Sequence, residues 1–219
     1  MGAFKGVSQF FKRPLSEVAT EFNYTEDNIL ILREDESGLM RKYPDIYANI
    51  RTCIHHADRR SYFEYAMDLV ASWLMEDYLL KTMSSDSYEI VLNGADKERR
   101  ILPSAKTSTS SDFLITKHET RISIEIMNDY TGFWKKHRVL HLRDTKYQSL
   151  QRAKSLFIAI ATSSGEFAIY DFRKSVAATR IPSHRPYGFK PAYELQMPVE
   201  MLKPITSDSI KMEIAKLIQ

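Results

Sequence analysis

The stretch from Asp112 to Met127 reads Asp-Phe-Leu-Ile-Thr-Lys-His-Glu-Thr-Arg-Ile-Ser-Ile-Glu-Ile-Met, and the acids at 112 and 125, in its two apolar runs, decide the interpretation of the chain. Apolar residues alternate with other residues on both sides of the polar segment 116–120, a pattern typical of a β-hairpin. Asp112 then starts the first strand, and Glu125 lies in the middle of the second. Two carboxylates that converge from adjacent strands can hold a hard divalent cation such as Mg²⁺, which prefers oxygen ligands.

A plainer interpretation is that each acid simply lies in solvent. Glu125 speaks against it, because isoleucines at 122, 124 and 126 flank this residue. A carboxylate inside a buried apolar strand is costly unless it is paired or bound to a metal. The pattern therefore favours a functional carboxylate at Glu125.

The composition is that of a globular domain. The chain has 219 residues, of which 43% are hydrophobic and 27% charged, enough for one well-filled core. No apolar run approaches the roughly 20 residues needed to span a bilayer, and Met1–Lys5 lacks the apolar core of a signal peptide. Because Cys53 is the single cysteine, an internal disulfide is excluded. We therefore expect a cytoplasmic protein that does not associate with membranes.

Positive charge is concentrated in the half of the chain that follows the two acids, although the net charge is only +3. The segment 121–154 holds eight bases and three acids, and the segment 173–190 holds five bases and no acid. This distribution indicates a polyanionic partner. Surface lysines of any soluble protein can imitate it, so the charge alone does not identify the partner.

The chain divides into two parts. Residues 1–57 mix short helical signals with turns and are expected to form an N-terminal helical appendage. Residues 58–219 are expected to form the core domain. It begins with a long helix from Arg59 to about Lys81, whose apolar residues recur at helical spacing. Glu76 falls within the apolar arc of this helix and is therefore expected to be buried.

The elements after this helix predict an α/β fold. A strand at 88–92 and a turn at Asn93-Gly94 precede the hairpin, and a basic loop at 135–138 leads to a short helix at 143–153. Strands are expected at 155–161 and 166–170, an irregular segment at 179–191, and a terminal helix capped by Asp208 or Ser209. This order predicts a mixed β-sheet flanked by helices.

The acid on the long helix, the acid that opens one strand and the acid inside the next strand together resemble the PD-(D/E)XK nuclease core. This family includes type II restriction endonucleases and Holliday-junction resolvases, and the resemblance covers about Asp58 to Phe172. It implies a restriction-endonuclease-like core in which Glu76, Asp112 and Glu125 bind Mg²⁺ and position water for phosphodiester hydrolysis. The implied function is sequence-specific cleavage of double-stranded DNA by a homodimer.

Two positions depart from the family pattern. Ser111 stands where the family has proline before the first acid, and Met127 stands where it has lysine. Lys146 is the candidate replacement, because it lies on the inward face of the helix at 143–153. Its side chain could instead extend along the surface into solvent. Asn128, Lys135 and Lys136 remain as substitutes.

The bases of the second half supply the candidate contacts to DNA. Lys135, Lys136, Arg138 and Arg143 are expected to bind phosphates, which adds affinity without sequence information. The segment 180–187, Arg-Ile-Pro-Ser-His-Arg-Pro-Tyr, offers Arg180, His184 and Arg185 for reading bases. The same segment could instead merely cover a sheet edge.

Met40 is an apolar residue beside Arg41 in an expected turn, and such a residue can enter a base step from the minor groove or pack on its own domain. Two alternatives to a restriction enzyme remain. They are a Holliday-junction resolvase-like nuclease and a catalytically inactive DNA-binding protein whose nuclease core has decayed at Met127.

Overall fold

The computed structural model describes residues 40–41, 44, 48, 62–94, 97, 111–129, 132–161 and 165–218. The appendage expected at 1–57 therefore lies outside the described residues, except for four of them. Of these four, Met40 and Arg41 are helical and exposed, and they do not form the turn that the sequence suggested.

The described part is mixed α/β, as predicted. Its elements in chain order are α6 (Tyr62–Met83), β1 (Glu89–Leu92), β2 (Phe113–Lys117), β3 (Thr120–Asn128), α7 (Phe133–His137), β4 (Val139–Arg143), α8 (Asp144–Ala153), β5 (Leu156–Ala161), β6 (Glu166–Asp171), β7 (Thr179–His184), the 3₁₀ turn η4 (Arg185–Tyr187), β8 (Lys190–Gln196), the 3₁₀ turn η5 (Val199–Met201), β9 (Lys203–Pro204) and α9 (Ser207–Leu217).

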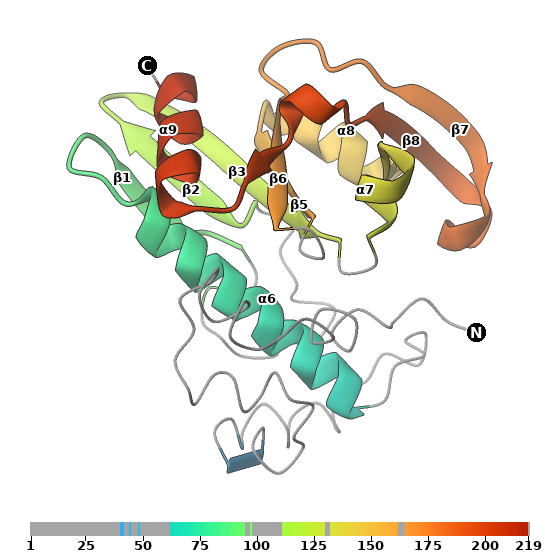
Figure 1. Cartoon of the computed structure of the whole chain (residues 1–219), viewed down its shortest axis with the longest axis horizontal. Coiled ribbons are helices and arrows are strands. Elements are labelled where there is room, and N and C mark those ends of the chain that lie inside the picture. The colour runs from blue at the N-terminus through green and yellow to red at the C-terminus, as the bar shows by residue number, and fades with distance from the viewer. Residues whose placement is uncertain are drawn as a thin grey trace.

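Two sheets organise these elements (Figure 1). The larger has six strands in the order β1-β2-β3-β5-β6-β9, and the smaller has three in the order β4-β8-β7. The β3–β5 pair is parallel, whereas the other pairs are antiparallel. The predicted mixed sheet is thus present. Because a parallel pair needs a crossover connection, the segment that contains α7, β4 and α8 links β3 to β5.

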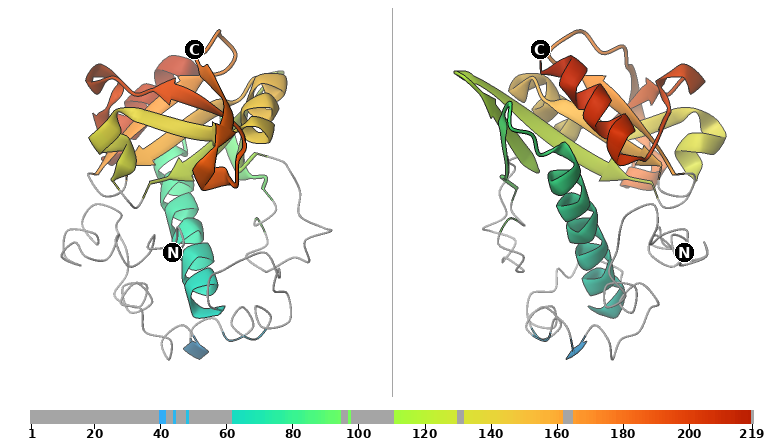
Figure 2. Two further views of the ribbon diagram at one scale, coloured as in Figure 1. Left: turned by 90° about the vertical axis from the view of Figure 1, so that its right-hand side faces the viewer. Right: turned by 60° about the vertical axis from the view of Figure 1, so that its left-hand side comes forward.

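The six-stranded sheet is covered on both faces. Phe113, Ile124 and Leu156 pack on one face against residues of α6 and α9. Phe157 and Ala159 belong to a second core with residues of α8 and the small sheet. Figure 2 shows this arrangement, with α9 and α8 on opposite sides of the strands. All six residues of β5 are buried, as the continuous apolar run predicted.

The prediction that residues 179–191 are irregular is wrong, because this segment contains β7, η4 and the start of β8. Proline disfavours a strand, but Pro182 lies in β7, an edge strand of the small sheet, where a missing N–H donor is tolerated. The ladder to β8 also shifts register between Ile181 and His184. These irregularities make the strand hard to recognise from sequence.

Two further boundaries differ from the predictions. Lys135 and Lys136 belong to helix α7 rather than a loop, and β4 follows directly. The terminal helix is capped by Thr206, whose side chain accepts a hydrogen bond from the Ser209 N–H (3.2 Å), and neither Asp208 nor Ser209 is the cap.

Candidate active site

Asp112 and Glu125 lie side by side because of the register of β2 and β3. In this antiparallel ladder Phe113 pairs with Ile124, so the next position places Asp112 opposite Glu125. Directly opposite residues have Cβ atoms about 4.5–5.5 Å apart. Asp112 also bonds across the pair, since its Oδ2 accepts a hydrogen bond from the Ile126 N–H (2.7 Å).

The turn after β1 holds the backbone of Asp112. The Asn93 N–H donates to the Asp112 carbonyl (2.8 Å), and the Asn93 side-chain amide donates to the Ser111 carbonyl (3.2 Å). A Cβ at Gly94 would lie 3.4 Å from both Cα and Oδ1 of Asp112. The sequence identified Asn93-Gly94 only as a turn. The structure makes it part of the site, and the glycine next to a hydrogen-bonding asparagine was the available signal.

Glu125 faces away from the isoleucines that flank it. Ile122 and Ile124 point into the core formed with α6 and α9, whereas Met127, on the face of Glu125, packs with the core of α8. The apolar surroundings inferred from the sequence are thus on the other side of the strand. Glu125 is nevertheless only 12% exposed at its side chain.

Lys146 supplies a cation to the carboxylate pair. It lies in the first turn of α8, and its Nζ pairs with Oε1 of Glu125. The Lys146 side chain is 35% exposed, so it neither is fully buried nor extends freely into solvent. Lys135, one of the proposed substitutes, pairs with Glu166 instead (3.4 Å).

Glu76 is buried in α6, with 6% of its surface exposed, as its position in the apolar arc predicted. It is close enough to influence Asp112, whose pKa rises to about 8. Burial is the main cause of this increase, and the charge of Glu125 is the next. The Ile126 N–H opposes the shift, Glu76 adds to it, and Lys146 opposes it. The four side chains therefore share one electrostatic environment.

Asp112 and Glu125 are the side chains of this group best placed to hold a magnesium ion. In the described part of the chain, no cluster of three or more histidine, cysteine, aspartate or glutamate side chains is placed to hold a metal, and the predicted role of Glu76 as a metal ligand stays a prediction. The facing pair Asp112 and Glu125 is sufficient, because Mg²⁺ is commonly bound by one or two carboxylates together with water and substrate phosphates. Their mutual repulsion is also what a divalent cation would relieve.

The candidate DNA contacts are only partly available. Lys136 is exposed, Arg138 caps α7 in a left-handed conformation (φ 58°), and Arg143 lies over the Tyr187 ring at 5.3 Å.

In the segment proposed to read bases, Arg180 and Arg185 are exposed. His184 is 8% exposed and its Nε2 lies 3.0 Å from Nδ1 of His141. The structure therefore places the His184 side chain inside the small sheet, and its role in reading bases stays a prediction.

In the described residues no helix is both long enough and apolar enough to cross a membrane. No family model, no curated protein and no solved structure matches the chain.

Proposed function

We propose that the protein is a Mg²⁺-dependent endonuclease that hydrolyses phosphodiester bonds of double-stranded DNA at specific sequences, in the manner of type II restriction endonucleases. The observation that carries this proposal is the contact of Lys146 with Glu125, directly beside Asp112. It brings two carboxylates and an ammonium together from two strands and a helix. The order of α6, the antiparallel β1–β3, α8 and the parallel β5 is also what the resemblance to the PD-(D/E)XK core implies.

Asp112 and Glu125 would hold the metal ion. Mg²⁺ bound there would neutralise charge on the phosphoryl oxygens and lower the pKa of a water molecule. Lys146 has three ammonium donors, so it can keep its contact with Glu125 and still donate to the attacking water or a phosphoryl oxygen. A fixed cation at the point where charge develops stabilises the transition state. Glu76 acts through Asp112, whose carboxylate it repels.

Lys136, Arg138 and Arg143 would bind phosphates and contribute affinity without sequence information. Arg180 and Arg185 would read base edges, since arginine pairs bidentately with guanine. Met40 and Arg41 remain candidates for contact with the minor groove.

The test is plasmid digestion with and without Mg²⁺. Asp112→Asn and Glu125→Gln should each abolish cleavage while binding to the plasmid persists or tightens, because each removes negative charge facing the phosphate. Glu76→Gln should be milder, about 10–100-fold, since it acts through Asp112. Asp86→Asn is the matched control, because Asp86 is an exposed acid in the turn before β1.

Near wild-type cutting by either of the first two variants would contradict the site. Discrete bands would establish sequence specificity, and cutting confined to four-way junctions would favour the resolvase-like alternative. If the protein binds DNA but does not cleave it in the presence of any divalent cation, it is the inactive DNA-binding protein.

A further inference from the structure

An exposed phenylalanine stands at the tip of the β7–β8 hairpin. Phe189 is 67% exposed and its φ is 63°, a left-handed conformation that is uncommon for a bulky residue. Its N–H donates to the His184 carbonyl (3.0 Å) and that of Gly188 donates to the Arg185 carbonyl (3.0 Å), so the turn is held by its own backbone. The backbone of the turn is thus fixed by hydrogen bonds, and it holds the Phe189 ring in solvent.

Folding does not account for Phe189. The ring is largely in solvent, and glycine or asparagine would adopt the left-handed backbone at lower cost. Unfavourable backbone conformations that persist are concentrated at sites of ligand contact. The side chain is therefore better explained by something that it binds.

The positive charges around the hairpin tip indicate a negatively charged partner. Arg185 and Lys190 flank Phe189 and are exposed, and no acid occurs from Arg173 to Lys190. Glu194, further along β8, pairs with His141 (3.0 Å). A partner that combines an apolar flat surface with dense negative charge on both sides fits this arrangement, and stacked bases between two phosphate backbones have those properties.

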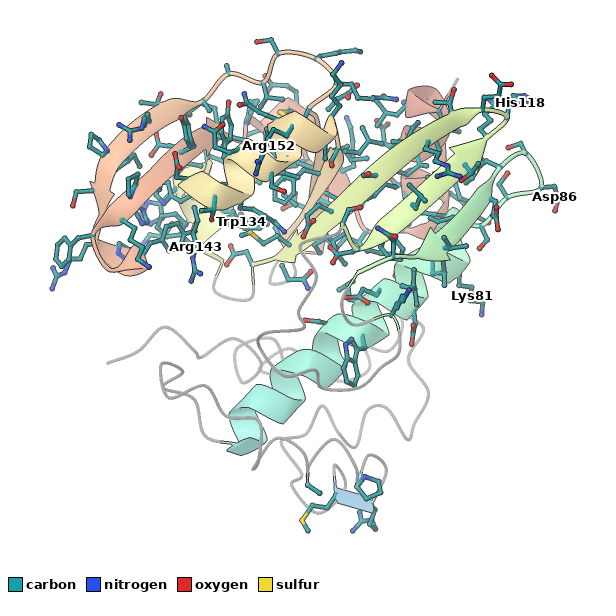
Figure 3. All side chains as sticks on the ribbon, turned by 180° about the vertical axis from the view of Figure 1, so that it is seen from behind. Lys81, Asp86, His118, Trp134, Arg143 and Arg152 are labelled. Atoms are coloured by element: carbon teal, nitrogen blue, oxygen red, sulfur yellow. The ribbon has the colours of Figure 1, made fainter. Side chains whose placement is uncertain are left out.

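The hairpin is attached next to the candidate active site. The Tyr187 hydroxyl donates to the His141 carbonyl on β4 (2.6 Å), and the Tyr187 ring contacts Arg143. Arg143 directly precedes α8, which carries Lys146 in its first turn. In Figure 3, β3 runs from the His118 turn at the upper right down towards the left, the side on which Arg143 lies. DNA held at the carboxylates can therefore extend towards the hairpin.

We propose that Phe189 inserts between neighbouring base pairs of duplex DNA while Lys190 contacts a flanking phosphate and Arg185 reaches the adjacent base edge. Apolar wedges beside cationic side chains bind DNA in this way. The proposal rests on the proposed function for the identity of the partner, but it does not require cleavage.

The test compares wild type with Phe189→Gly in EDTA, by fluorescence anisotropy of a labelled duplex of random sequence and of labelled heparin, a polyanion without bases. Phe189→Gly should weaken duplex binding about tenfold, the scale of one lost stacking contact. Its affinity for heparin should be unchanged, and its urea midpoint should be equal or higher because the left-handed backbone is relieved. Val199→Ala is the control, since Val199 is exposed on η5, and it should bind both probes as wild type does.

Equal duplex affinity of Phe189→Gly and wild type would overturn the proposal, as would a parallel loss for heparin. A change in molar mass of Phe189→Gly by light scattering would also overturn it, because the tip would then bind another copy of the chain. The two proposals separate cleanly. If the protein cleaves DNA and Phe189→Gly binds the duplex as wild type does, only the proposed insertion of Phe189 is wrong. If duplex binding depends on Phe189 and no cleavage occurs, only the proposed nuclease activity is wrong.

Discussion

At the scale of single residues, Met127 on β3 packs into the core, and Lys146 on α8 supplies the cation beside the carboxylates. Met127 shares the face of β3 with Glu125 and packs into the core beside α8. A lysine there would need to carry its charge out of that core to reach the carboxylates. Lys146 approaches the same carboxylates from the first turn of α8, where its stem is partly in solvent. The helix thus supplies a cation without burying it fully.

Lys146→Ala should lower the kcat of DNA cleavage by about 10²–10³ while DNA binding changes little, since it removes a charge that stabilises the transition state. Lys146→Arg should fail too, because the larger planar guanidinium does not replace a compact ammonium. Adding Met127→Lys should partly restore Lys146→Ala. Single-turnover cleavage is the measurement, and Arg152→Ala at the exposed end of α8 is the control. Normal cutting by Lys146→Ala would place the catalytic cation elsewhere, with Lys135 or Lys136 next in line.

Asp112 should make the metal-free protein less stable as the pH rises. Its pKa is raised from 3.8 to about 8, so the folded state holds a proton that the unfolded state has lost. Its contribution to stability is therefore greatest below about pH 4 and declines as the pH approaches 8. Asp112→Asn should remove this decline, which urea unfolding in EDTA from pH 5 to pH 8 would measure. Added Mg²⁺ should stabilise wild type most at pH 8. Parallel curves for the two proteins would contradict the expectation.

At the scale of elements, what the sequence predicts well is local. Asp112 and Glu125 meet because a hairpin fixes its own register, and the buried run of β5 is recognisable because a parallel strand covered on both faces has no polar residues. The small sheet was missed because β4 pairs with β8 over a long sequence distance and because β7 contains Pro182 and a register shift. The burial of His184 was missed for the same reason. Without β4, nothing in the segment indicates that the side chain of His184 contacts that of His141.

The small sheet should lose stability in acid. The pKa of His184 is lowered from 6.5, mainly by burial and then by His141, while Glu194 opposes the shift. Since the unfolded chain binds this proton more readily, the stabilising contribution is present above pH 6.5 and is lost as the pH falls below it. Hydrogen exchange at the amides of β7 and β8 should therefore accelerate, relative to β5, between pH 7 and pH 5 after correction for intrinsic rates. His184→Gln should flatten this dependence, whereas His118→Asn in the exposed hairpin turn should not. An unchanged profile in His184→Gln would contradict the assignment.

At the scale of the whole molecule, the described part offers one candidate site, with the carboxylates at the start of β2 and on β3, two interior strands of the large sheet, and the hairpin tip beyond Arg143. A single site acts on one strand of a duplex, and the two strands run in opposite directions. A two-fold symmetric pair of chains presents the same site to both strands, and its symmetry implies a palindromic recognition sequence.

Two chains per DNA duplex are therefore expected during cleavage. Light scattering on a duplex that contains one site should give the mass of two chains, and mixing wild type with inactive Glu125→Gln chains tests whether both are needed. If each chain cuts one strand, a dimer with one inactive chain only nicks plasmid DNA. Nicked circles should then accumulate as the inactive fraction rises. The amount of linear product should fall with the square of the active fraction. A linear decrease without nicking, or one chain per duplex throughout turnover, would mean that a single site cuts both strands in turn. The control is wild type diluted with Asp86→Asn chains, which should leave the ratio of linear to nicked product unchanged.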